Sequence, residues 1–202
     1  MRKSTPATPR TPGLRAARRL ARAGPDCAHA EQVTRLADGL RRAFEPLAPL
    51  APREAQLLSC AALLHDLGMA GGVAGHHKRS RDIILAAHLP GLSDRERAIV
   101  AAVARYHRKA HPARTHKLYR SLSPKAQDVA RRLAALLRIA DGLDRAHGNA
   151  VRSVAARREA PGRWVLELRG PGDLRYAAWG AARKGRLFEL VFGVRLRISP
   201  AA

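Results

Sequence analysis

The sequence predicts a mainly α-helical protein, with a helical domain over residues 25–149 and a small α+β appendage over residues 150–202. Before Asn149, apolar residues recur at steps of three and four, which is the period of an amphipathic helix. After Asn149, they fall into short alternating segments between Gly- and Pro-rich turns, as in strands. With 202 residues, of which 46% are hydrophobic, the chain is long enough to bury a core.

A basic tail is expected ahead of the helical domain. Residues 1–24 are rich in Arg, Pro and Thr and contain no acidic residue, so we expect them to be disordered. They lack the apolar central segment of a secretory signal, although their Arg-rich composition also suits an organellar transit peptide.

The first two helices are predicted over residues 27–47 and 53–67. In the first helix, Val33, Leu36 and Leu40 mark an apolar stripe on one face. The second helix is apolar on most of its faces, which predicts that it is central and buried.

Two further helices are predicted in the middle of the chain. The first covers residues 76–88 and stops near Pro90, which cannot continue a helix. The next begins after Ser93, a good N-cap, and Glu96 three residues later completes a capping box. We expect this helix to reach about Lys109.

A long helix and the appendage complete the predicted fold. Ser123 as N-cap and Pro124 at the first helical position start a helix that reaches about His147. In the appendage, strands are followed by a helix over residues 181–192 and a strand over residues 194–198. The aromatic residues expected in the core of the appendage are Trp164, Trp179, Phe188 and Phe192.

The charge of the chain is strongly positive. It carries 38 Lys and Arg residues against 16 Asp and Glu residues, a formal charge of +22. A GC-rich coding sequence and selection for a polyanionic ligand explain this excess about equally well. Nucleic-acid binding through a nonspecific basic surface is an alternative, but no groove-reading motif supports it. Aromatic residues make up only 4%, which disfavours a stacking platform for single-stranded nucleic acid.

Cysteine use and hydropathy predict a cytoplasmic protein. Cys27 and Cys60 form neither a close-spaced metal motif nor a disulfide framework. No apolar run approaches the roughly 18 residues of a membrane span. We therefore expect no membrane partner.

The most informative motif is His65-Asp66, at the end of a strongly apolar predicted helix. Ionisable groups at such a place are costly to bury unless they are compensated, and an imidazole beside a carboxylate can bind one divalent cation. The pair alone is weak support, because helix-end Asp and surface His residues are common. His29 and Asp141 strengthen it, since both are polar residues beside apolar stripes.

The order His29, then His65-Asp66, then Asp141, each on a separate predicted helix, resembles the HD metal-dependent phosphohydrolase superfamily. More narrowly, residues 26–198 resemble the C-terminal HD-like region of the exopolyphosphatase/guanosine pentaphosphate phosphohydrolase family. The segments that carry this resemblance are 29–33, 61–68, 76–80, 89–93, 104–109, 138–145, Trp179, 182–184 and 187–193. The resemblance implies an HD-domain helical bundle.

The resemblance also implies a metal site and an activity. The metal ligands it implies are His29, His65, Asp66 and Asp141. Imidazole and carboxylate ligands together suit Mn²⁺, Mg²⁺, Fe²⁺, Co²⁺ or Ni²⁺. A divalent cation held in this way would activate a water molecule, so the implied reaction is hydrolysis of a phosphoanhydride or phosphoester.

Two departures from the family pattern limit which residue roles and activities of the family can be expected of this chain. Arg79 stands where the family commonly has His, so it would bind phosphate and could not transfer a proton. The chain also lacks the N-terminal actin-like phosphatase domains that carry the exopolyphosphatase site in full-length relatives. We therefore expect an HD-like region that stands alone. The resemblance to the family does not by itself imply that this chain has exopolyphosphatase activity.

Further roles are predicted for residues near these motifs. Catalytic roles are assigned to Asp66 and His107, although His107 also suits a stabilising position at a helix C-terminus. Asp144 either pairs with Arg145, which is slightly favoured, or orients a metal ligand. The basic residues expected to bind substrate phosphate are Lys78, Arg79, Arg108, Lys109 and Arg145. Five histidines are expected on the surface: His76, His77, His111, His116 and His147. The alternative for His76 or His77 is that one of them binds a second metal ion.

The leading functional hypothesis is an HD-type, divalent-metal-dependent phosphohydrolase. Its expected substrate is a nucleotide, a guanosine polyphosphate or a polyphosphate-like molecule. The alternative is a non-catalytic regulatory module that binds polyphosphate or a nucleotide. The four-ligand set favours the enzyme, because a pure binding module has no need of convergent metal ligands. A homodimer is also compatible with the sequence.

Overall fold

The computed structural model describes residues 11–201. In this part of the chain the elements run in the order α1 (Pro12–Ala21), α2 (Cys27–Ala43), α3 (Pro52–Leu64), the 3-10 helix η1 (Leu67–Gly71), α4 (His76–Ala86), α5 (Asp94–Arg105), α6 (Lys117–Ser121), α7 (Pro124–Leu143), β1 (Ser153–Ala160), β2 (Arg163–Arg169), α8 (Arg175–Lys184), α9 (Arg186–Phe192) and β3 (Arg195–Pro200). The predicted fold class, a mainly helical protein with a small α+β part at its C-terminal side, is confirmed.

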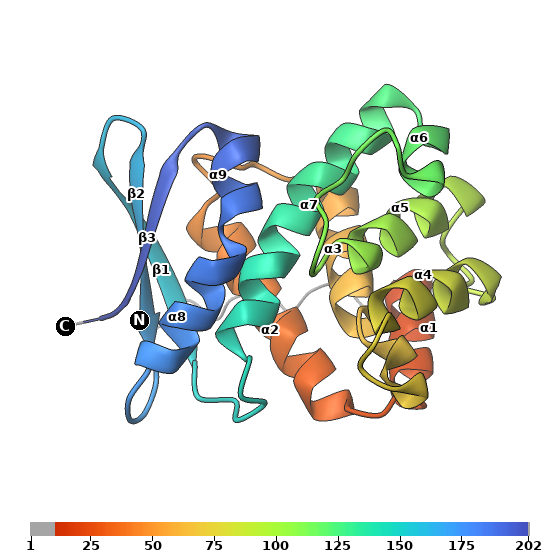
Figure 1. The fold of residues 1–202 in the computed structure, drawn as a ribbon, viewed down its shortest axis with the longest axis horizontal. Coiled ribbons are helices and arrows are strands. Elements are labelled where there is room, and N and C mark those ends of the chain that lie inside the picture. Colours follow the sequence, from red (N-terminus) through yellow and green to blue (C-terminus); the bar gives the residue numbers. More distant parts are fainter. Residues whose placement is uncertain (1–10, 202) are drawn as a thin grey trace.

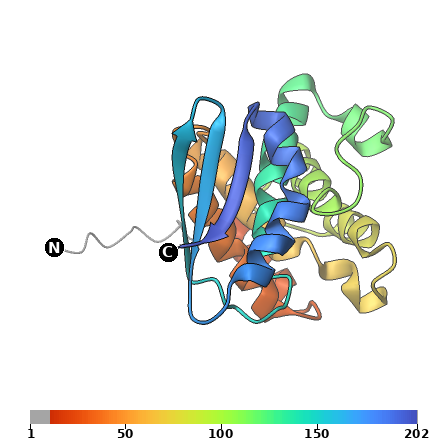
Figure 2. The same cartoon turned by 60° about the vertical axis from the view of Figure 1, so that its left-hand side comes forward.

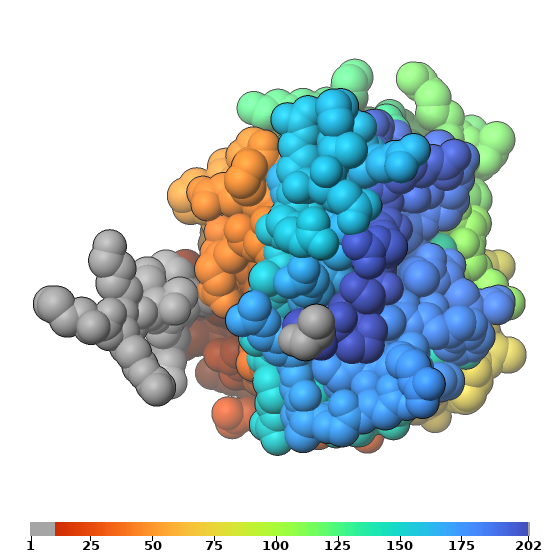
Figure 3. All heavy atoms as spheres, turned by 90° about the vertical axis from the view of Figure 1, so that its left-hand side faces the viewer, coloured from red at the N-terminus to blue at the C-terminus, as the bar shows by residue number. Residues whose placement is uncertain are grey.

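A three-stranded sheet packs along one side of the helical bundle (Figures 1 and 2). Its strand order is β1-β2-β3, with β1 antiparallel to β2 and β3 parallel to β2. Strand β1 packs on α2, whereas β3 packs on α8 and α9. The outer face of the sheet forms this side of the molecule (Figure 3). One hydrophobic core includes residues of the bundle, the sheet and α9.

Helix α7 lies at the centre of the molecule, packed against α2, α3, α5, α8 and α9 (Figure 1). It starts as the sequence predicts, because Ser123 accepts a hydrogen bond from the backbone N–H of Ala126 and Pro124 is the first helical residue. Every residue from Leu133 to Leu143 is buried. Helix α3 is likewise buried from Gln56 to Leu64, which confirms the prediction that this helix is central.

The prediction of a disordered tail over residues 1–24 is wrong for its described part. Residues 12–21 form α1, which is capped by Thr11 and packs on α3. Leu14, Ala17 and Ala21 recur at steps of three and four and are buried. Because arginines stand between these residues, the Arg-rich composition of the segment does not reveal the apolar stripe. The rest of the predicted tail, residues 1–10, lies outside the described residues.

The end of the chain differs from the prediction in two respects. The single helix expected over residues 181–192 is two helices, α8 and α9, which meet at Gly185, and α8 begins at Arg175. Trp179 was expected in the core, but its side chain is exposed. Trp164 and Phe192 are half-buried and Phe188 is buried, so these three aromatic residues do pack on the core.

None of the described helices is by itself long and apolar enough to cross a membrane. Among the described residues, one pair of joined segments, Pro52–Gly71 and His76–Ala86, passes such a test by length and composition, and the two segments are bent by 115° relative to each other.

Candidate metal centre

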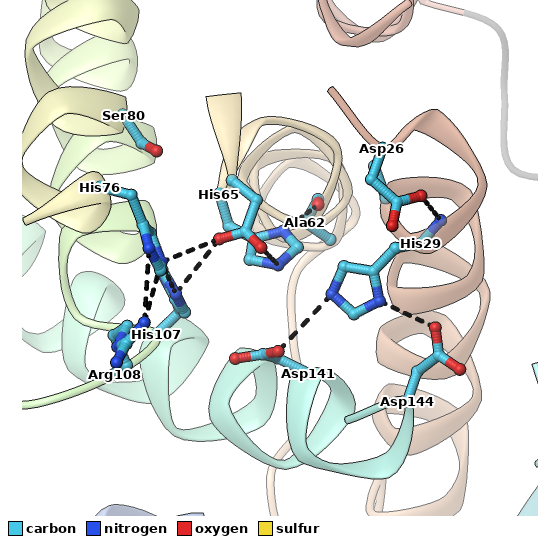
Figure 4. Close-up of polar contacts among 12 residues, drawn as sticks. Asp26, His29, Ala62, His65, His76, Ser80, His107, Arg108, Asp141 and Asp144 are labelled. Atoms are coloured by element: carbon cyan, nitrogen blue, oxygen red, sulfur yellow. Dashed lines mark hydrogen bonds and ion pairs between the residues drawn. The ribbon is translucent and has the colours of Figure 1, made fainter. Parts of the chain in front are cut away.

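His65 lies at the end of α3 (Figure 4). Asp66 follows it, where the chain turns into η1. The His65 ring is buried, and its Nδ1 donates a hydrogen bond to the carbonyl of Ala62 at 2.7 Å. A carbonyl only accepts, so the proton of the neutral ring is on Nδ1 and the Nε2 atom carries a lone pair. That Nε2 atom makes no hydrogen bond.

His29 approaches the same point from the first turn of α2. Its backbone N–H is capped by Asp26 at 2.9 Å, which fixes the start of the helix. The ring Nδ1 lies 2.8 Å from Oδ2 of Asp144, and the Nε2 atom lies 3.6 Å from Oδ1 of Asp141. Asp144 therefore orients the His29 ring, as carboxylates behind metal-ligating histidines do. Of the two predicted roles of Asp144, the structure shows a contact with His29, the predicted metal ligand.

Three of the predicted metal ligands converge in one group. His29, His65 and Asp66 each offer a ligand atom, and these atoms lie within 4.8 Å of one another. His29 Nε2, His65 Nε2 and Asp66 Oδ1 are buried without a hydrogen bond in the described structure. Buried polar atoms are normally hydrogen-bonded, so their convergence fits a site for a cation.

A second group shares Asp66 with the first. His76 at the start of α4 and His107 after α5 complete it, again with ligand atoms within 4.8 Å of one another. Nδ1 of His76 donates to the carbonyl of Val73 at 3.0 Å, and Nδ1 of His107 donates to that of Ala104 at 2.7 Å. Both rings thus direct an Nε2 atom toward Asp66, and Figure 4 shows the His76 and His107 side chains next to each other.

The two Nε2 atoms of this group face each other closely. They are 3.1 Å apart. Asp66 Oδ1 lies 3.2 Å from the Nε2 atom of His76 and 3.4 Å from the Nε2 atom of His107. Three atoms with lone pairs repel one another at this separation unless a proton or a cation lies between them. The chemistry of this second group therefore also fits a divalent cation.

Asp141, the fourth predicted ligand, lies at the edge of the first group. It projects from α7, and it is not a member of either three-residue group. Its Oδ2 atom forms an ion pair with the ammonium group of Lys184 on α8. Lys184 was not among the residues predicted from the sequence to belong to the site. The segment 182–184 carries part of the family resemblance, and this was the one signal in the sequence that pointed to it.

The electrostatics keep both acids of the centre ionised. Burial would raise the pKa of Asp66, but the surrounding imidazoles hold it below its usual range. Burial would likewise raise the pKa of Asp141, which Lys184 and the nearby histidines hold well below that range. Burial lowers the pKa of His107 to about 3, so its ring is neutral at neutral pH. Burial alone would lower the pKa of His29 too, but the carboxylates beside it raise it to about 9.

Two glycines next to the site allow its elements to approach closely. A Cβ atom on Gly68 would lie 2.3 Å from the carbonyl oxygen of His76 and 2.7 Å from the N atom of Ser80. A Cβ atom on Gly142 would lie 2.6 Å from the Cα of Ala181. Glycine therefore lets α4 pack against the turn after Asp66, and lets α8 pack against α7 beside Asp141.

The centre opens into a cavity of about 530 Å³. Asp66, His76, His107 and Asp141 contribute to its lining. The cations that line it are Arg108, Lys109, Arg138, Arg145, Arg183 and Lys184. Three of the residues predicted to bind substrate phosphate line this cavity, namely Arg108, Lys109 and Arg145, and their role in binding stays a prediction.

Lys78 and Arg79 do not line this cavity. Lys78 is exposed on α4. Arg79 donates hydrogen bonds to the carbonyls of Gly68 at 3.0 Å, of Ala74 at 2.6 Å and of Gly72. Its guanidinium group therefore holds the turn after Asp66, whereas the sequence predicted a phosphate contact.

Two of the five histidines expected on the surface are buried, namely His76 and His77. Burial lowers the pKa of His77 to about 4, and its ring is not part of either metal group. His147 is exposed as expected, yet it stacks on His29 with ring centroids 3.8 Å apart. His111 and His116 are half-buried, outside the centre.

Helical architecture and a histidine-aspartate centre shared by several helices define this protein as an HD-like domain. Residues 16–169 match the family described as Ppx/GppA phosphatase, domain III. The chain belongs to this family, which confirms the resemblance to exopolyphosphatase and guanosine pentaphosphate phosphohydrolase C-terminal regions. The match ends before α8, the helix that carries Lys184.

Proposed function

We propose that this protein is a divalent-metal-dependent phosphohydrolase that acts on a phosphorylated small molecule. The observation that carries the proposal is the position of two histidine-aspartate groups beside a cavity into which Asp66, the residue they share, and both histidines of the second group project. Six Lys and Arg side chains line this cavity: Arg108, Lys109, Arg138, Arg145, Arg183 and Lys184. A nucleotide, a guanosine polyphosphate and a polyphosphate all present the phosphoryl oxygens that such a cavity suits.

The donor set suits a hard or borderline cation such as Mn²⁺, Mg²⁺, Fe²⁺, Co²⁺ or Ni²⁺. His29, His65 and Asp66 would hold it in the first group, and Asp66, His76 and His107 in the second. When bound, a divalent cation lowers the pKa of a water molecule and polarises a phosphoryl oxygen.

The protein's own side chains have separate tasks in this proposal. Asp66 is ionised and shared by both groups, so it holds cations and does not donate a proton. His107 is neutral, which suits a ligand and not a general acid. Arg108, Lys109 and Lys184 offer charge-assisted hydrogen bonds to phosphate from the cavity wall.

Buried Arg138 positions two of these segments. Its guanidinium group donates to the carbonyl of Tyr106 at 2.9 Å and to that of Lys184 at 3.4 Å. It therefore ties the segment before His107 to the end of α8, and so fixes both sides of the cavity.

The test is phosphate release from a panel of nucleoside triphosphates, guanosine polyphosphates and inorganic tripolyphosphate, with and without Mn²⁺. Asp66→Asn should abolish metal-dependent release, while Asp128→Asn, an exposed site on the same α7 that carries Asp141, should not. The proposal fails if wild type releases no phosphate from any of these compounds, or if Asp66→Asn is as active as wild type.

A second candidate is a non-catalytic module that binds polyphosphate or a nucleotide. The observation that favours it is the ion pair of Lys184 with Asp141, since an ammonium group neutralises the carboxylate predicted as the fourth metal ligand. In that case a phosphorylated ligand should bind with equal affinity with and without divalent cation, and no phosphate should be released.

The remaining expectations from the sequence stay predictions. These are a cytoplasmic location, a homodimer and nonspecific binding of nucleic acid to the basic surface.

A further inference from the structure

We propose that Tyr176 and Trp179 on α8 form a subsite that binds the flat ring of a phosphorylated ligand, a nucleobase, at the mouth of the cation-lined cavity. This inference rests on the proposed function, because it concerns the ligand of the same cavity. It assigns a role to a helix that lies outside the residues matched to the family.

The exposure of these side chains is unusual for their type. In the described part of the chain, five large hydrophobic residues are exposed: Val73, Ile83, Tyr176, Trp179 and Leu190. Tyr176 is 53% exposed and Val73 is 60% exposed, and both line the cavity. Trp179 is 45% exposed and stacks on Tyr176, with ring centroids 5.4 Å apart and planes 24° apart. Apolar surface is thus concentrated where the cavity opens.

Two arginines fix the tryptophan in place. The guanidinium carbon of Arg145 lies 5.4 Å from the Trp179 ring centroid, and that of Arg183 lies 5.1 Å from it. Both arginines also line the cavity. Cation–π contacts of this kind hold an aromatic ring and keep positive charge beside it. A surface that combines π faces with guanidinium groups matches a ligand that is aromatic at one end and anionic at the other.

Helix α8 sets the distance between the ring subsite and the phosphate site. Lys184 pairs with Asp141 at the C-terminal end of this helix, and Tyr176 lies eight residues earlier in the sequence. At about 1.5 Å per residue, the two positions are about 12 Å apart along the helix axis. The close contact of Gly142 with Gly180, where a Cβ would lie 2.7 Å from the Gly180 oxygen, holds α8 in this place. This span suits a nucleoside polyphosphate, whereas an inorganic phosphate chain has no ring to use the aromatic pair.

The experiment compares two ligands with the same number of phosphates, GTP and inorganic tripolyphosphate. We expect the protein to bind GTP about 5- to 100-fold more tightly by calorimetry, the range expected from one base stacked on an aromatic side chain. In a Trp164→Phe background, Trp179 is the remaining tryptophan, and GTP but not tripolyphosphate should quench its fluorescence. Tripolyphosphate carries the higher charge, so electrostatics alone predicts the opposite preference.

Variants show whether the aromatic pair causes the preference. Tyr176→Ala and Trp179→Ala should reduce GTP affinity to that of tripolyphosphate and leave tripolyphosphate affinity unchanged. Tyr176→Leu keeps apolar bulk without the π face and should behave in the same way. Leu190→Ala is the matched control, because Leu190 is 51% exposed on α9 and does not line the cavity. Equal affinity of wild type for both ligands, or unchanged GTP affinity in folded Tyr176 and Trp179 variants, overturns the proposal.

The two proposals fail in different ways. Metal-dependent release of phosphate from tripolyphosphate with no preference for GTP overturns the ring subsite and leaves the phosphohydrolase intact. A preference for GTP that depends on Tyr176 and Trp179, with no phosphate release from any compound, overturns the phosphohydrolase and supports the subsite.

Discussion

The Nε2 atoms of His76 and His107 face each other at 3.1 Å, although both rings already donate from Nδ1 to a backbone carbonyl. Each backbone carbonyl therefore selects the tautomer that leaves a lone pair in the site. Asp66 lies against both rings and belongs to the other group of potential ligands as well. Asp66 is thus the residue that the two groups of potential ligands have in common.

The role of Asp144 behind His29 can be tested with Asp144→Asn. The variant keeps the shape of the side chain but removes the carboxylate that lies 2.8 Å from His29 Nδ1. We expect metal affinity to fall by about 10- to 100-fold, as it does when the residue that orients a histidine ligand is replaced. Metal titration checks this, with Asp128→Asn as the control. Unchanged affinity would show that His29 is not a ligand or that Asp144 does not orient it.

The close approach of α7 and α8 predicts a strong effect of Gly142→Ala. The added methyl group would lie 2.6 Å from the Cα of Ala181, so the two backbones must separate. We expect a loss of about 1 to 3 kcal/mol in the free energy of unfolding, measured by urea denaturation. Gly148→Ala is the control, because a Cβ there meets nothing within 4 Å. An equal loss in both variants would contradict the packing argument.

Phosphate affinity should depend on the cavity and not on the total charge. Arg108→Ala removes a cation from the cavity wall and should weaken tripolyphosphate binding by about 1.5 to 3 kcal/mol, measured by calorimetry. Arg22→Ala removes the same charge from an exposed position after α1 and should have little effect. If both variants lose the same affinity, the charge of +22 acts diffusely.

Glu96 predicts a pH-dependent contribution to stability. Arg53 donates to both of its carboxylate oxygens, at 2.6 and 2.7 Å, and lowers the pKa of Glu96 to about 2. The unfolded-state pKa is about 4.3, so the stabilisation is complete above that pH and is lost as the pH falls toward 2. Glu96→Gln should therefore cost about 1 kcal/mol at pH 7, because the pair is partly exposed and Glu96 also caps α5.

Thermal unfolding from pH 7 down to pH 2 checks this prediction. The difference between wild type and Glu96→Gln should shrink below pH 4.3, whereas the exposed-site variant Glu45→Gln should show no such trend. A difference that stays constant over the whole range would rule out the Glu96 carboxylate as its source.

Much of the helical fold could be predicted because its signals are local. Ser93 with Glu96, and Ser123 with Pro124, cap helices at the expected places. Helix α1 was missed because its apolar residues are separated by arginines, so its composition resembled that of a tail. The break at Gly185 was missed because α8 and α9 together follow one apolar pattern.

The centre could be predicted only in part, because several of its contacts are tertiary. His29, His65 and Asp66 do converge as predicted. His76 follows a glycine-rich turn, and only the packing of α4 against that turn buries it in the site. Lys184 is separated from Asp141 by 43 positions in the sequence, and the contact of α7 with α8 brings them together. No local pattern marks such a pair.

The central claim is that Asp66 is shared by two groups that hold divalent cations, and elemental analysis after loading with Mn²⁺ and desalting tests it most directly. Asp66→Asn should lose essentially all bound metal, His107→Ala should lose part of it, and Asp128→Asn should match wild type. These results follow because Asp66 belongs to both groups and His107 to one. Wild-type protein that binds none of Mn²⁺, Mg²⁺, Fe²⁺, Co²⁺ and Ni²⁺, or a folded Asp66→Asn variant that retains the wild-type metal content, would contradict the claim.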